Sequence, residues 1–439
     1  ADPTLDGVAC LVFDEFHDRN LDSDLCLALA LQGREVFREG PPLKLLIMSA
    51  TLDGAKVANL LGNAPVLTSE GRQFPVTAHF GMPHQLRDSI VASTVTAVLQ
   101  ALRQHEGSVL VFLPGQREIR AVERDLKARL LQEHLDQVLV APLYGGLPMT
   151  SQQAAIRPAP AGQRKVVLAT NVAETSLTIE GVDVVVDSGL VREALFDPAT
   201  GMTRLATRRI SRASAEQRQG RAGRLGPGHC YRLWSAEQHQ RLVAHGTPEI
   251  LRADLAPLAL QLLAWGINEP RELAWLDPPP DAAFGQAAAM LEQCGAAFTR
   301  HRGQRQLTPH GVRLAQMPLH PRLAHMLLIG CDIHATETAC LLAALLCEHN
   351  PLADRGVDIA ATIDVLMGAR RCPDHLQGWF RRTWQQARRF ARLASELHQP
   401  AQRPIDVPSG DILGVLLASA YPDRVARLRE GGQGVDYQL

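Results

Sequence analysis

The feature that most constrains this chain is the alternation of short apolar runs with helical patterns over its first half. Six apolar runs cover residues 8–13, 43–48, 109–113, 138–142, 166–169 and 182–187. Segments such as 22–37 and 116–131 carry helical periodicity between them. Strands that alternate with helices favour parallel sheets covered on both faces. The sequence therefore predicts an α/β fold, with 8–13 as a buried parallel strand.

After about residue 248 the strand signal fades. Four leucines fall on one helical stripe, and they are Leu251, Leu255, Leu258 and Leu262. A helix near 282–294, a hairpin near 302–305 and a helix capped by Thr308 suggest a small winged-helix-like module. Residues 321–397 have helical patterns, with Leu376, Phe380, Ala387, Phe390, Ala394 and Leu397 expected on one buried face.

Composition excludes several classes of protein. The chain has 439 residues, of which 46% are hydrophobic and 21% charged, which is typical of a globular protein. A net charge of -1 excludes a globally basic nucleic-acid binder, so such a site would be local. No apolar stretch is long enough for a membrane span, and no export leader is visible. Eight cysteines without a C-x-x-C pair favour reduced thiols in a cytoplasm.

Two adjacent carboxylates follow the first apolar run, in Asp14-Glu15-Phe16-His17. Ligands bind at the carboxyl ends of strands in open parallel sheets. Asp14 could hold Mg²⁺, directly or through water, and Glu15 could orient and deprotonate an attacking water. Taken by itself, the motif more often forms an ordinary acidic turn.

Hydroxyl residues follow the second apolar run, in Ser49-Ala50-Thr51. They could relay a conformational change through hydrogen bonds. Thr51 or Asp53 would equally well cap the helix that follows. The polar segment 170–179 follows another buried run, where it could contact a phosphate backbone. A capped surface helix explains that segment as well.

The most informative segment is Gln217-Arg-Gln-Gly-Arg-Ala-Gly-Arg224. Its three arginines are spaced by three, and we expect them on one face of a helix that glycines interrupt. Arg221 and Arg224 suit the stabilisation of a transferring γ-phosphoryl group. A solvated basic face would explain neither Gln217 nor the glycines, which cost about 1 kcal/mol each in a helix.

Together these motifs resemble those of DEAH/RHA-type superfamily 2 helicases, in both order and spacing. The resemblance rests on segments 14–17, 49–51, 109–115, 170–176 and 217–224, and segments 275–280 and 318–323 look like the bacterial HrpB-like subgroup. It covers essentially the whole chain. It implies an ATP-dependent, nucleic-acid-stimulated helicase that uses ATP and Mg²⁺ and acts on single-stranded RNA or DNA, without a membrane partner and as a monomeric motor.

The resemblance also implies roles for individual residues. Asp14 and Glu15 match the metal-binding and water-activating acids, and His17 couples them to the second domain. Ser49 and Thr51 match the motif that links nucleotide state to grip on the strand. The remaining matches are strand contacts at Gly115, Thr170 and Asn171, nucleotide-facing residues Ser176 and Glu180, and the opposing residues Gln217, Arg221 and Arg224. Many relatives have Asp where Glu180 stands.

The implied architecture is α/β, with a partial and a complete RecA-like domain followed by winged-helix-like and all-helical, ratchet-like domains. We expect the partial RecA-like domain at 1–82, the complete one at 83–247, the winged-helix-like domain at 248–318, the ratchet-like domain at 319–397 and the start of a C-terminal region at 398–439. Residues 192–206 resemble a strand-separating β-hairpin.

The sequence departs from the family at the phosphate loop. That loop requires G-x-x-x-x-G-K-[ST], yet none of the four lysines, Lys44, Lys56, Lys127 and Lys165, follows a glycine. We therefore expect a fragment of a longer helicase that is inactive as it stands. Alternative hypotheses are a natural ATPase-dead relative, a non-catalytic nucleic-acid-binding scaffold and a DNA-specific translocase.

Two further clusters have mundane explanations. Cys331, His334, Cys340, Cys347 and His349 could suggest a metal site, but their spacing is irregular and favours structural thiols. The arginines between residues 370 and 392 make a helical segment basic. A solvated face is the default interpretation there, and the flank of a nucleic-acid channel is the alternative.

Overall fold

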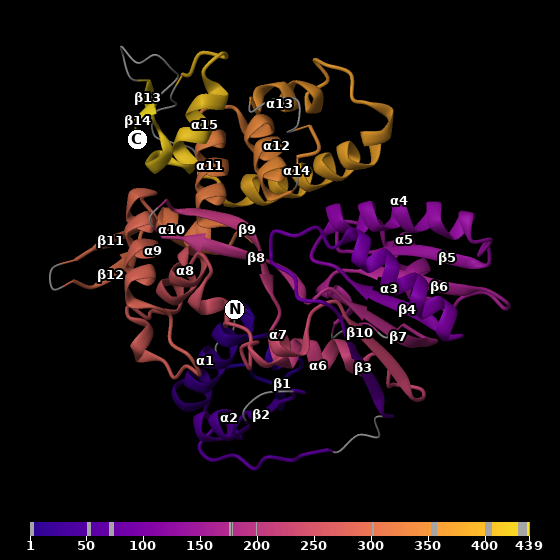
Figure 1. Ribbon diagram of the computed structural model, residues 1–439. Coiled ribbons are helices and arrows are strands. Elements are labelled where there is room, and N and C mark those ends of the chain that lie inside the picture. The colour runs from indigo at the N-terminus through magenta and orange to yellow at the C-terminus, as the bar shows by residue number, and fades with distance from the viewer. Residues whose placement is uncertain are drawn as a thin grey trace. The chain divides into compact units, whose positions relative to one another are not determined.

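The structure, a computed structural model, describes residues 4–50, 54–69, 74–174, 177, 179–198, 200–300, 303–348, 350–352, 358–399, 406–428 and 437–438. The chain forms two compact units, which Figure 1 shows coloured along the sequence. The first unit comprises residues 1–253 and 273–278, and the second comprises 254–272 and 279–439.

The first unit is built around a six-stranded parallel sheet with the order β3-β10-β7-β4-β6-β5. In chain order the strands are β3 (Val76–Phe80), β4 (Ser108–Phe112), β5 (Val138–Leu143), β6 (Arg164–Ala169), β7 (Val182–Asp187) and β10 (Gly228–Arg232). This sheet confirms the predicted α/β class. The sequence-based division placed residues 76–80 in the first part, whereas β3 pairs with β10 and belongs to this sheet.

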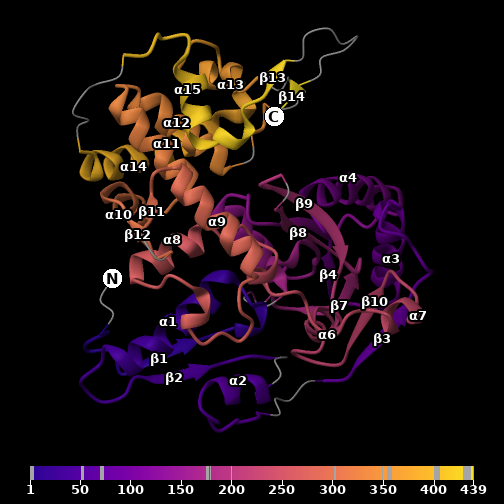
Figure 2. The same ribbon diagram turned by 90° about the vertical axis from the view of Figure 1, so that its left-hand side faces the viewer.

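Helices cover both faces of the sheet, as Figure 2 shows. The helices are α3 (Val91–Gln104), α4 (Gln116–Gln132), α5 (Met149–Ile156), α6 (Arg212–Gly220) and the short α7 (Ala236–Gln240). Val109 and Val111 of β4 pack with α3 and α4, whereas Leu110 and Phe112 pack with α5 on the opposite face. Side chains of successive strand residues alternate between faces, so a continuous apolar run fills two cores.

The first residues form a much smaller sheet. Strands β1 (Cys10–Phe13) and β2 (Lys44–Ile47) are parallel, and η1 (Phe16–Asp18), α1 (Leu21–Val36) and α2 (Gly54–Leu60) accompany them. Phe13 packs against a buried cluster that includes α1, but Val12 is 54% exposed on the other face. The prediction of a buried strand at 8–13 was therefore wrong: within the described residues this sheet has two strands and one covered face.

A long antiparallel hairpin projects from the sheet core of the first unit. It consists of β8 (Leu190–Asp197) and β9 (Met202–Arg209), paired from Leu190 with Arg209 to Asp197 with Met202. Gly201 has a φ of 62°, a backbone conformation that favours glycine in the turn. The hairpin expected at 192–206 is thus present and longer at both ends.

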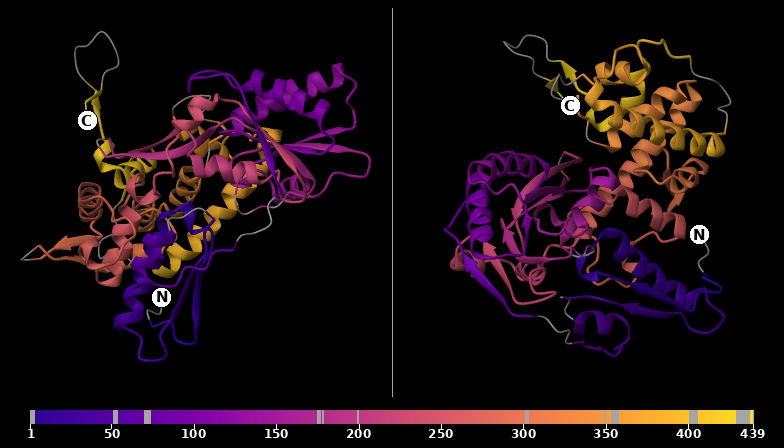
Figure 3. Two further views of the ribbon diagram at one scale, coloured as in Figure 1. Left: turned by 60° about the horizontal axis from the view of Figure 1, so that its bottom comes forward. Right: turned by 90° about the vertical axis from the view of Figure 1, so that its right-hand side faces the viewer.

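The second unit begins with helices and one small hairpin. The elements are α8 (Ala256–Trp265), α9 (Asp281–Gln293), β11 (Ala297–Thr299), β12 (Arg305–Leu307) and α10 (Pro309–Ala315). β11 and β12 are antiparallel, and their hairpin stands out in the left view of Figure 3. Thr308 caps α10 by accepting a hydrogen bond from the Gly311 N–H at 3.0 Å, as the sequence predicted.

The rest of the second unit is mainly helical. Its elements are α11 (Pro321–Asp332), α12 (Thr336–Cys347), α13 (Ala360–Leu366), α14 (Gln377–Leu397), α15 (Ile412–Ala420), β13 (Arg427–Leu428) and β14 (Tyr437–Gln438). The buried stripe of α14 consists of Trp379, Thr383, Ala387, Phe390 and Ala394. Phe380 was predicted on this face but is only half-buried, because Trp379 takes the core position beside it.

Two kinds of feature are absent from the described residues. No helix there is both long and apolar enough to cross a bilayer. No group of three histidine, cysteine or acidic side chains there is arranged to hold a metal ion, and His349 lies outside the residues the structure describes. Burial raises the pKa of the Cys340 thiol to about 12, which keeps it protonated.

Candidate active site

The acidic loop after β1 adopts an unusual backbone. Asp14 is exposed, and its Oδ1 accepts a hydrogen bond from the Glu15 N–H at 2.8 Å. Glu15 is half-buried and has a φ of 49°, in the left-handed region that non-glycine residues rarely adopt. Such conformations concentrate at functional sites, where surrounding structure enforces them. Here the Phe16 N–H bonds to the Met48 carbonyl at 3.0 Å, which ties the loop to β2.

His17 connects the acidic loop to the loop after β2. Its Nδ1 accepts a hydrogen bond from the Ala50 N–H at 3.3 Å. Its Nε2 lies 3.4 Å from a Glu15 carboxylate oxygen and 3.7 Å from one of Asp18. The structure therefore joins the two predicted motifs of the small sheet through one imidazole. Ser49 is exposed beside Ala50, and Thr51 lies outside the described residues.

The predicted strand-contacting residues follow two neighbouring strands. Gly115 comes after β4 and immediately precedes α4, and Thr170 and Asn171 come after β6. β4 and β6 are adjacent and parallel, with Phe112 opposite Ala169, so their carboxyl ends meet at one edge. Gly115 is buried, Thr170 half-buried and Asn171 exposed. Asn171 opens the single 3₁₀ turn η2 (Asn171–Ala173) and is one of the residues that line a cleft of the first unit.

The arginine segment differs from its expected helical form. α6 ends at Gly220, so Arg221 and Arg224 follow in a turn and the three arginines do not share one helical face. Gly223 explains the break, because its N–H bonds back to the Gly220 carbonyl and its carbonyl faces Phe74, just before β3. Its carbonyl accepts from the Phe74 N–H at 3.1 Å, and a Cβ at Gly223 would lie 2.7 Å from the Phe74 oxygen. The close approach expected at the glycines is therefore to the chain's own sheet.

Arg218, which sequence reasoning did not assign to the site, is the most buried residue of this segment. Its guanidinium is 1% exposed and lies 2.9 Å from a carboxylate oxygen of Glu174 and 2.9 Å from one of Asp187. It also lies over the Phe112 ring, 4.9 Å from the centroid. Desolvation alone would raise the pKa of Asp187, and the adjacent guanidinium opposes that shift. A buried charge is tolerable only when it is paired in this way.

Arg221 completes the link between α6 and the loop after β6. Its guanidinium donates to the backbone carbonyls of Glu174 and Leu177, the latter at 2.8 Å. Burial lowers the pKa of Arg221 to about 10, Arg224 acts in the same direction, and Glu15 opposes both. Arg221 therefore stays charged at neutral pH. The acid from the small sheet and the two arginines are within electrostatic reach of one another.

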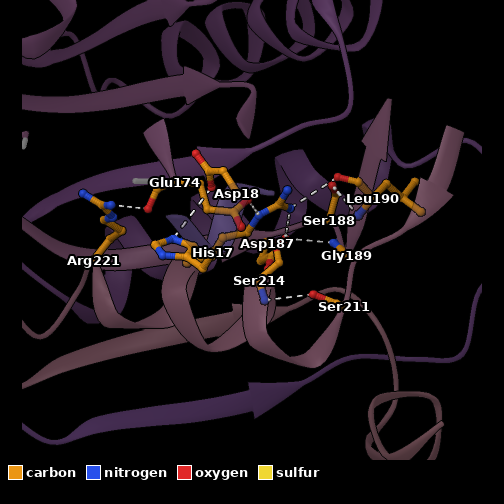
Figure 4. Close-up of polar contacts among 11 residues, drawn as sticks. His17, Asp18, Glu174, Asp187, Ser188, Gly189, Leu190, Ser211, Ser214 and Arg221 are labelled. Carbon is orange, nitrogen blue, oxygen red and sulfur yellow. Dashed lines mark hydrogen bonds and ion pairs between the residues drawn. The ribbon is translucent and has the colours of Figure 1, made fainter. Parts of the chain in front are cut away.

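A cleft of about 1060 Å³ lies in the first unit between these elements. Among the predicted residues, its lining includes His17, Asn171 and Gln217. Figure 4 shows His17 and Asp18 beside Glu174 and Arg221. Burial raises the pKa of the Asp18 carboxyl, although the nearby His17 opposes the shift and Glu15 and Glu174 add to it.

Other predicted residues have less defined places. Glu180 is exposed in the loop before β7, and Ser176 lies outside the described residues. Sequence reasoning also missed Asp18, Glu174 and Asp187. Only Asp187 left a signal: a carboxylate that ends an apolar strand needs a cationic partner if the strand is buried.

Comparisons with known proteins identify relatives of this chain. The family described as "Helicase conserved C-terminal domain" matches residues 85–226. The chain is 42% identical over 440 residues to "ATP-dependent RNA helicase HrpB" of Escherichia coli, covering 100% of this chain and 50% of that protein. It is 36% identical over 352 residues to "Pre-mRNA-splicing factor ATP-dependent RNA helicase prp22" of Schizosaccharomyces pombe, covering 80% of this chain and 30% of that protein.

Solved structures give the same result. A structure of the "E. coli DExH-box NTPase HrpB" superposes with a TM-score of 0.79 at 40% identity, covering 100% of this chain and 50% of that one. A second, of "Escherichia coli DEAH/RHA helicase HrpB", gives a TM-score of 0.81 at 40% identity, covering 100% and 51%. The chain thus spans about half the length of these bacterial relatives.

Proposed function

Because the chain belongs to the DEAH/RHA helicase family, we propose that it forms part of an ATP-dependent RNA helicase that translocates on a single strand and unwinds duplexes. The observation that carries the proposal is the cleft of the first unit, where His17, Asn171 and Gln217 share one lining. Glu15 and Arg221 are not among the residues that line this cleft, but they lie within electrostatic reach of each other. ATP would bind there, between the acidic loop and the arginine turn.

Glu15 is the proposed general base. Its carboxylate would orient the attacking water and accept the proton that this water loses as its oxygen bonds to the γ-phosphorus, while the bond from that phosphorus to ADP breaks and ADP leaves. The left-handed backbone at Glu15 and the contact with His17 Nε2 at 3.4 Å hold the carboxylate in place. His17 thereby acts as a positioning residue. Because its Nδ1 also accepts a hydrogen bond from the Ala50 N–H, it links Glu15 to the loop after β2.

Asp14 is the proposed ligand of Mg²⁺. Its carboxylate is exposed at the carboxyl end of β1, and magnesium is commonly bound by one or two carboxylates together with substrate phosphates. The donor set at this loop therefore fits the ion. When bound, Mg²⁺ would neutralise part of the charge of the phosphates. Glu15 lies next to Asp14 and would share that environment.

Arg221 and Arg224 would stabilise the charge of the transferring phosphoryl group from the other side of the cleft. Gln217 would orient the water or a phosphate oxygen from α6. Arg221 is tied to the Glu174 and Leu177 carbonyls, so a change of its position is transmitted to the loop that carries Thr170 and Asn171. That loop and Gly115 are the proposed contacts to the strand backbone.

The remaining assignments extend the same scheme. Ser49 and Thr51 would relay nucleotide state, Ser176 and Glu180 would face the nucleotide, and the β8–β9 hairpin would separate strands. On the family likeness we divide the chain into two RecA-like parts, predicted at 1–82 and 83–247 but with β3 joining the second, a winged-helix-like part at 248–318, a ratchet-like part at 319–397 and a C-terminal part at 398–439. A cytoplasmic location and a monomeric motor belong to the same proposal.

The test is phosphate release in the full-length polypeptide that contains this chain. Glu15→Gln should lower RNA-stimulated turnover by at least about a hundredfold and leave ATP binding intact, whereas Glu39→Gln, an exposed position outside the cleft, should change neither. Undiminished turnover in Glu15→Gln would refute the assignment. Parallel measurements on the 439-residue chain test the scaffold alternative, which predicts strand binding without turnover in either length.

Competition between matched RNA and DNA strands tests the substrate. The proposal expects RNA to stimulate phosphate release and unwinding. Stimulation by DNA alone would favour the DNA-specific translocase. Matched strands are the appropriate probes, because backbone contacts are common to both nucleic acids.

A further inference from the structure

A short 3₁₀ helix of the first unit, η3 (Glu249–Leu251), lies between the acidic loop and the β8–β9 hairpin. Three backbone hydrogen bonds run through it in series. The Glu249 N–H donates to the Arg19 carbonyl at 3.0 Å, and the Arg252 N–H donates to the Glu249 carbonyl at 2.9 Å. The Phe196 N–H of β8 then donates to the Arg252 carbonyl at 2.9 Å. An unbroken series of contacts therefore leads from the turn after the acidic loop to the hairpin.

The carboxylate of Glu249 reinforces the first of these contacts. Its Oε2 accepts a hydrogen bond from the Leu21 N–H at 2.9 Å, in the first turn of α1. The N–H groups of a first helical turn have no partner within the helix, and the positive end of the helix dipole favours a carboxylate there. Glu249 therefore holds α1 with its side chain and the preceding turn with its backbone.

The turn that Glu249 contacts is itself held firmly. Arg19 has a φ of 47°, in the same left-handed region as Glu15. Its guanidinium lies 3.1 Å from a carboxylate oxygen of Asp24 and 2.7 Å from one of Asp277. The Arg19 side chain is only 12% exposed, so solvent screens these ion pairs little. We therefore expect the turn and α1 to move together when the acidic loop is displaced.

Arg252 holds the hairpin end of the series. Besides the carbonyl that accepts from Phe196, its guanidinium Nη1 donates to the Ala194 carbonyl at 3.0 Å. Its Nε donates to the Thr247 carbonyl at 3.2 Å, which fixes the side chain against its own loop. Ala194 and Phe196 both lie within the paired part of the hairpin. Ile250 is completely buried between the two ends, so η3 has a fixed seat.

We propose that η3, through Glu249 and Arg252, transmits displacements of the acidic loop to the β8–β9 hairpin, and that both are positioning residues. Each uses backbone and side chain together, and they hold opposite partners. Its use in unwinding rests on the proposed function, because the loop would respond to nucleotide and the hairpin would meet the duplex. The link between the two elements requires no ATP. Coupling of this kind is reciprocal, so a displaced hairpin also shifts the loop.

The first test is hydrogen exchange in the full-length polypeptide that contains this chain, without nucleotide. Glu249→Ala should speed exchange of the Phe196 amide about fivefold or more, because a loosened η3 releases the Arg252 carbonyl. Glu249→Gln keeps an acceptor for the Leu21 N–H and should preserve slow exchange. The control is Glu39→Ala at an exposed position. Faster exchange confined to residues 19–23, where the carboxylate binds, would overturn the proposal.

Variants at Arg252 test the link from the opposite end. Arg252→Ala should speed exchange of the Leu21 amide, and Arg241→Ala, an exposed residue of the same cleft, should not. In Glu249→Ala/Arg252→Ala the Phe196 amide should exchange no faster than in the stronger single variant, because both changes interrupt one link. Multiplied effects would show two independent structural contacts and contradict the proposal. Circular dichroism verifies that each variant is folded.

The second test is the number of duplexes unwound per phosphate released by the same full-length protein. Glu249→Ala and Arg252→Ala should each lower this ratio about fivefold or more, and Glu249→Gln should restore it. An unchanged ratio in variants whose hairpin exchanges faster would refute the coupling role. Coupled exchange in a wild-type protein without RNA-stimulated phosphate release would contradict the proposed function and leave the link through η3 standing.

Discussion

Arginine is concentrated in two regions of this chain, at the end of α6 and along α14, and the two regions treat its charge differently. Arg218 is buried between Glu174 and Asp187, and Arg221 is held by backbone carbonyls. On α14 the arginines that line an open groove are Arg381, Arg388, Arg389 and Arg392. They are exposed and have no carboxylate within ion-pair distance in the described part of the chain. A paired, buried guanidinium fixes structure, whereas an exposed row remains in contact with solvent. The role of an arginine therefore cannot be predicted from residue type alone and depends on the groups that surround it.

The comparison is sharpest at Arg224, which is exposed although it belongs to the first region. In the full-length polypeptide, Arg224→Gln should lower RNA-stimulated phosphate release by about 10³-fold or more, as loss of an arginine finger does. The stability of the protein should hardly change. Steady-state phosphate release measures this effect, with Arg212→Gln, an exposed position on α6, as the control. If the Arg224→Gln variant releases phosphate within about threefold of the wild-type rate, Arg224 has no catalytic role and is an ordinary solvated arginine.

Arg218 should show the largest effect on stability. Arg218→Met leaves the carboxylate of Asp187, which is completely buried, without its cation. Breaking one side of a buried pair costs about 3–5 kcal/mol in the free energy of unfolding. Urea denaturation measures it, and Arg388→Met on the exposed face of α14 is the matched control, expected within about 0.5 kcal/mol. If Arg218→Met and Arg388→Met lower the free energy of unfolding equally, the distinction between buried, paired arginines and exposed arginines is wrong.

A third way to accommodate a basic group is to keep it neutral, as the second unit does with a histidine pair. His310 Nε2 lies 2.8 Å from His325 Nδ1. Burial lowers the pKa of His310 from 6.5 to about 4, with His325 and Arg313 adding to the shift and Asp332 opposing it. The unfolded chain therefore binds a proton below pH 6.5 that the folded chain does not accept until about pH 4.

Stability should accordingly rise with pH across this window and be lost as the pH falls from 6.5 toward 4. We expect a loss of about 2 kcal/mol from this site, after allowance for its partial exposure. Denaturation midpoints at several pH values measure it. His310→Asn should flatten the dependence, and an unchanged pH profile in that variant would assign the titration to other groups.

The smallest effect is expected at an exposed ion pair that lies just before α14. Arg371 and Asp374 lie 3.4 Å apart with side chains that are 86% and 85% exposed. Solvent screens such pairs, so Asp374→Asn should change the unfolding free energy by less than about 0.5 kcal/mol. A larger loss in urea denaturation would mean that the basic face of α14 depends on its flanking carboxylates.

Much of the fold followed from periodicity. β7 has the limits predicted for the run 182–187, and α4 begins at the predicted Gln116. The strands β3 and β10 were not predicted, because polar residues interrupt the apolar ones in Val76–Phe80 and Gly228–Arg232 and make both segments resemble loops. Phe380 was placed in the core because helical spacing alone cannot choose between neighbouring stripes of α14.

The site residues that follow a strand could be predicted from the sequence, whereas contacts between residues distant along the chain could not. Asp14, Glu15 and His17 follow a strand, so their position at a sheet edge could be inferred from order along the chain. The role of Arg218 could not, since its partners Glu174 and Asp187 are distant in sequence. The helix end at Gly220 depends on contacts of the following turn with β3, which local propensity does not contain.

The sequence by itself determined the alternation of strands and helices, the family and the types of residue at each strand end. These properties are local, because periodicity and strand termini depend on neighbouring residues. Tertiary structure decided which arginines are buried against carboxylates and which line an open groove. Pairing of this kind depends on the distance between groups that are remote along the chain, and electrostatic energy follows that distance and the surrounding burial rather than residue type.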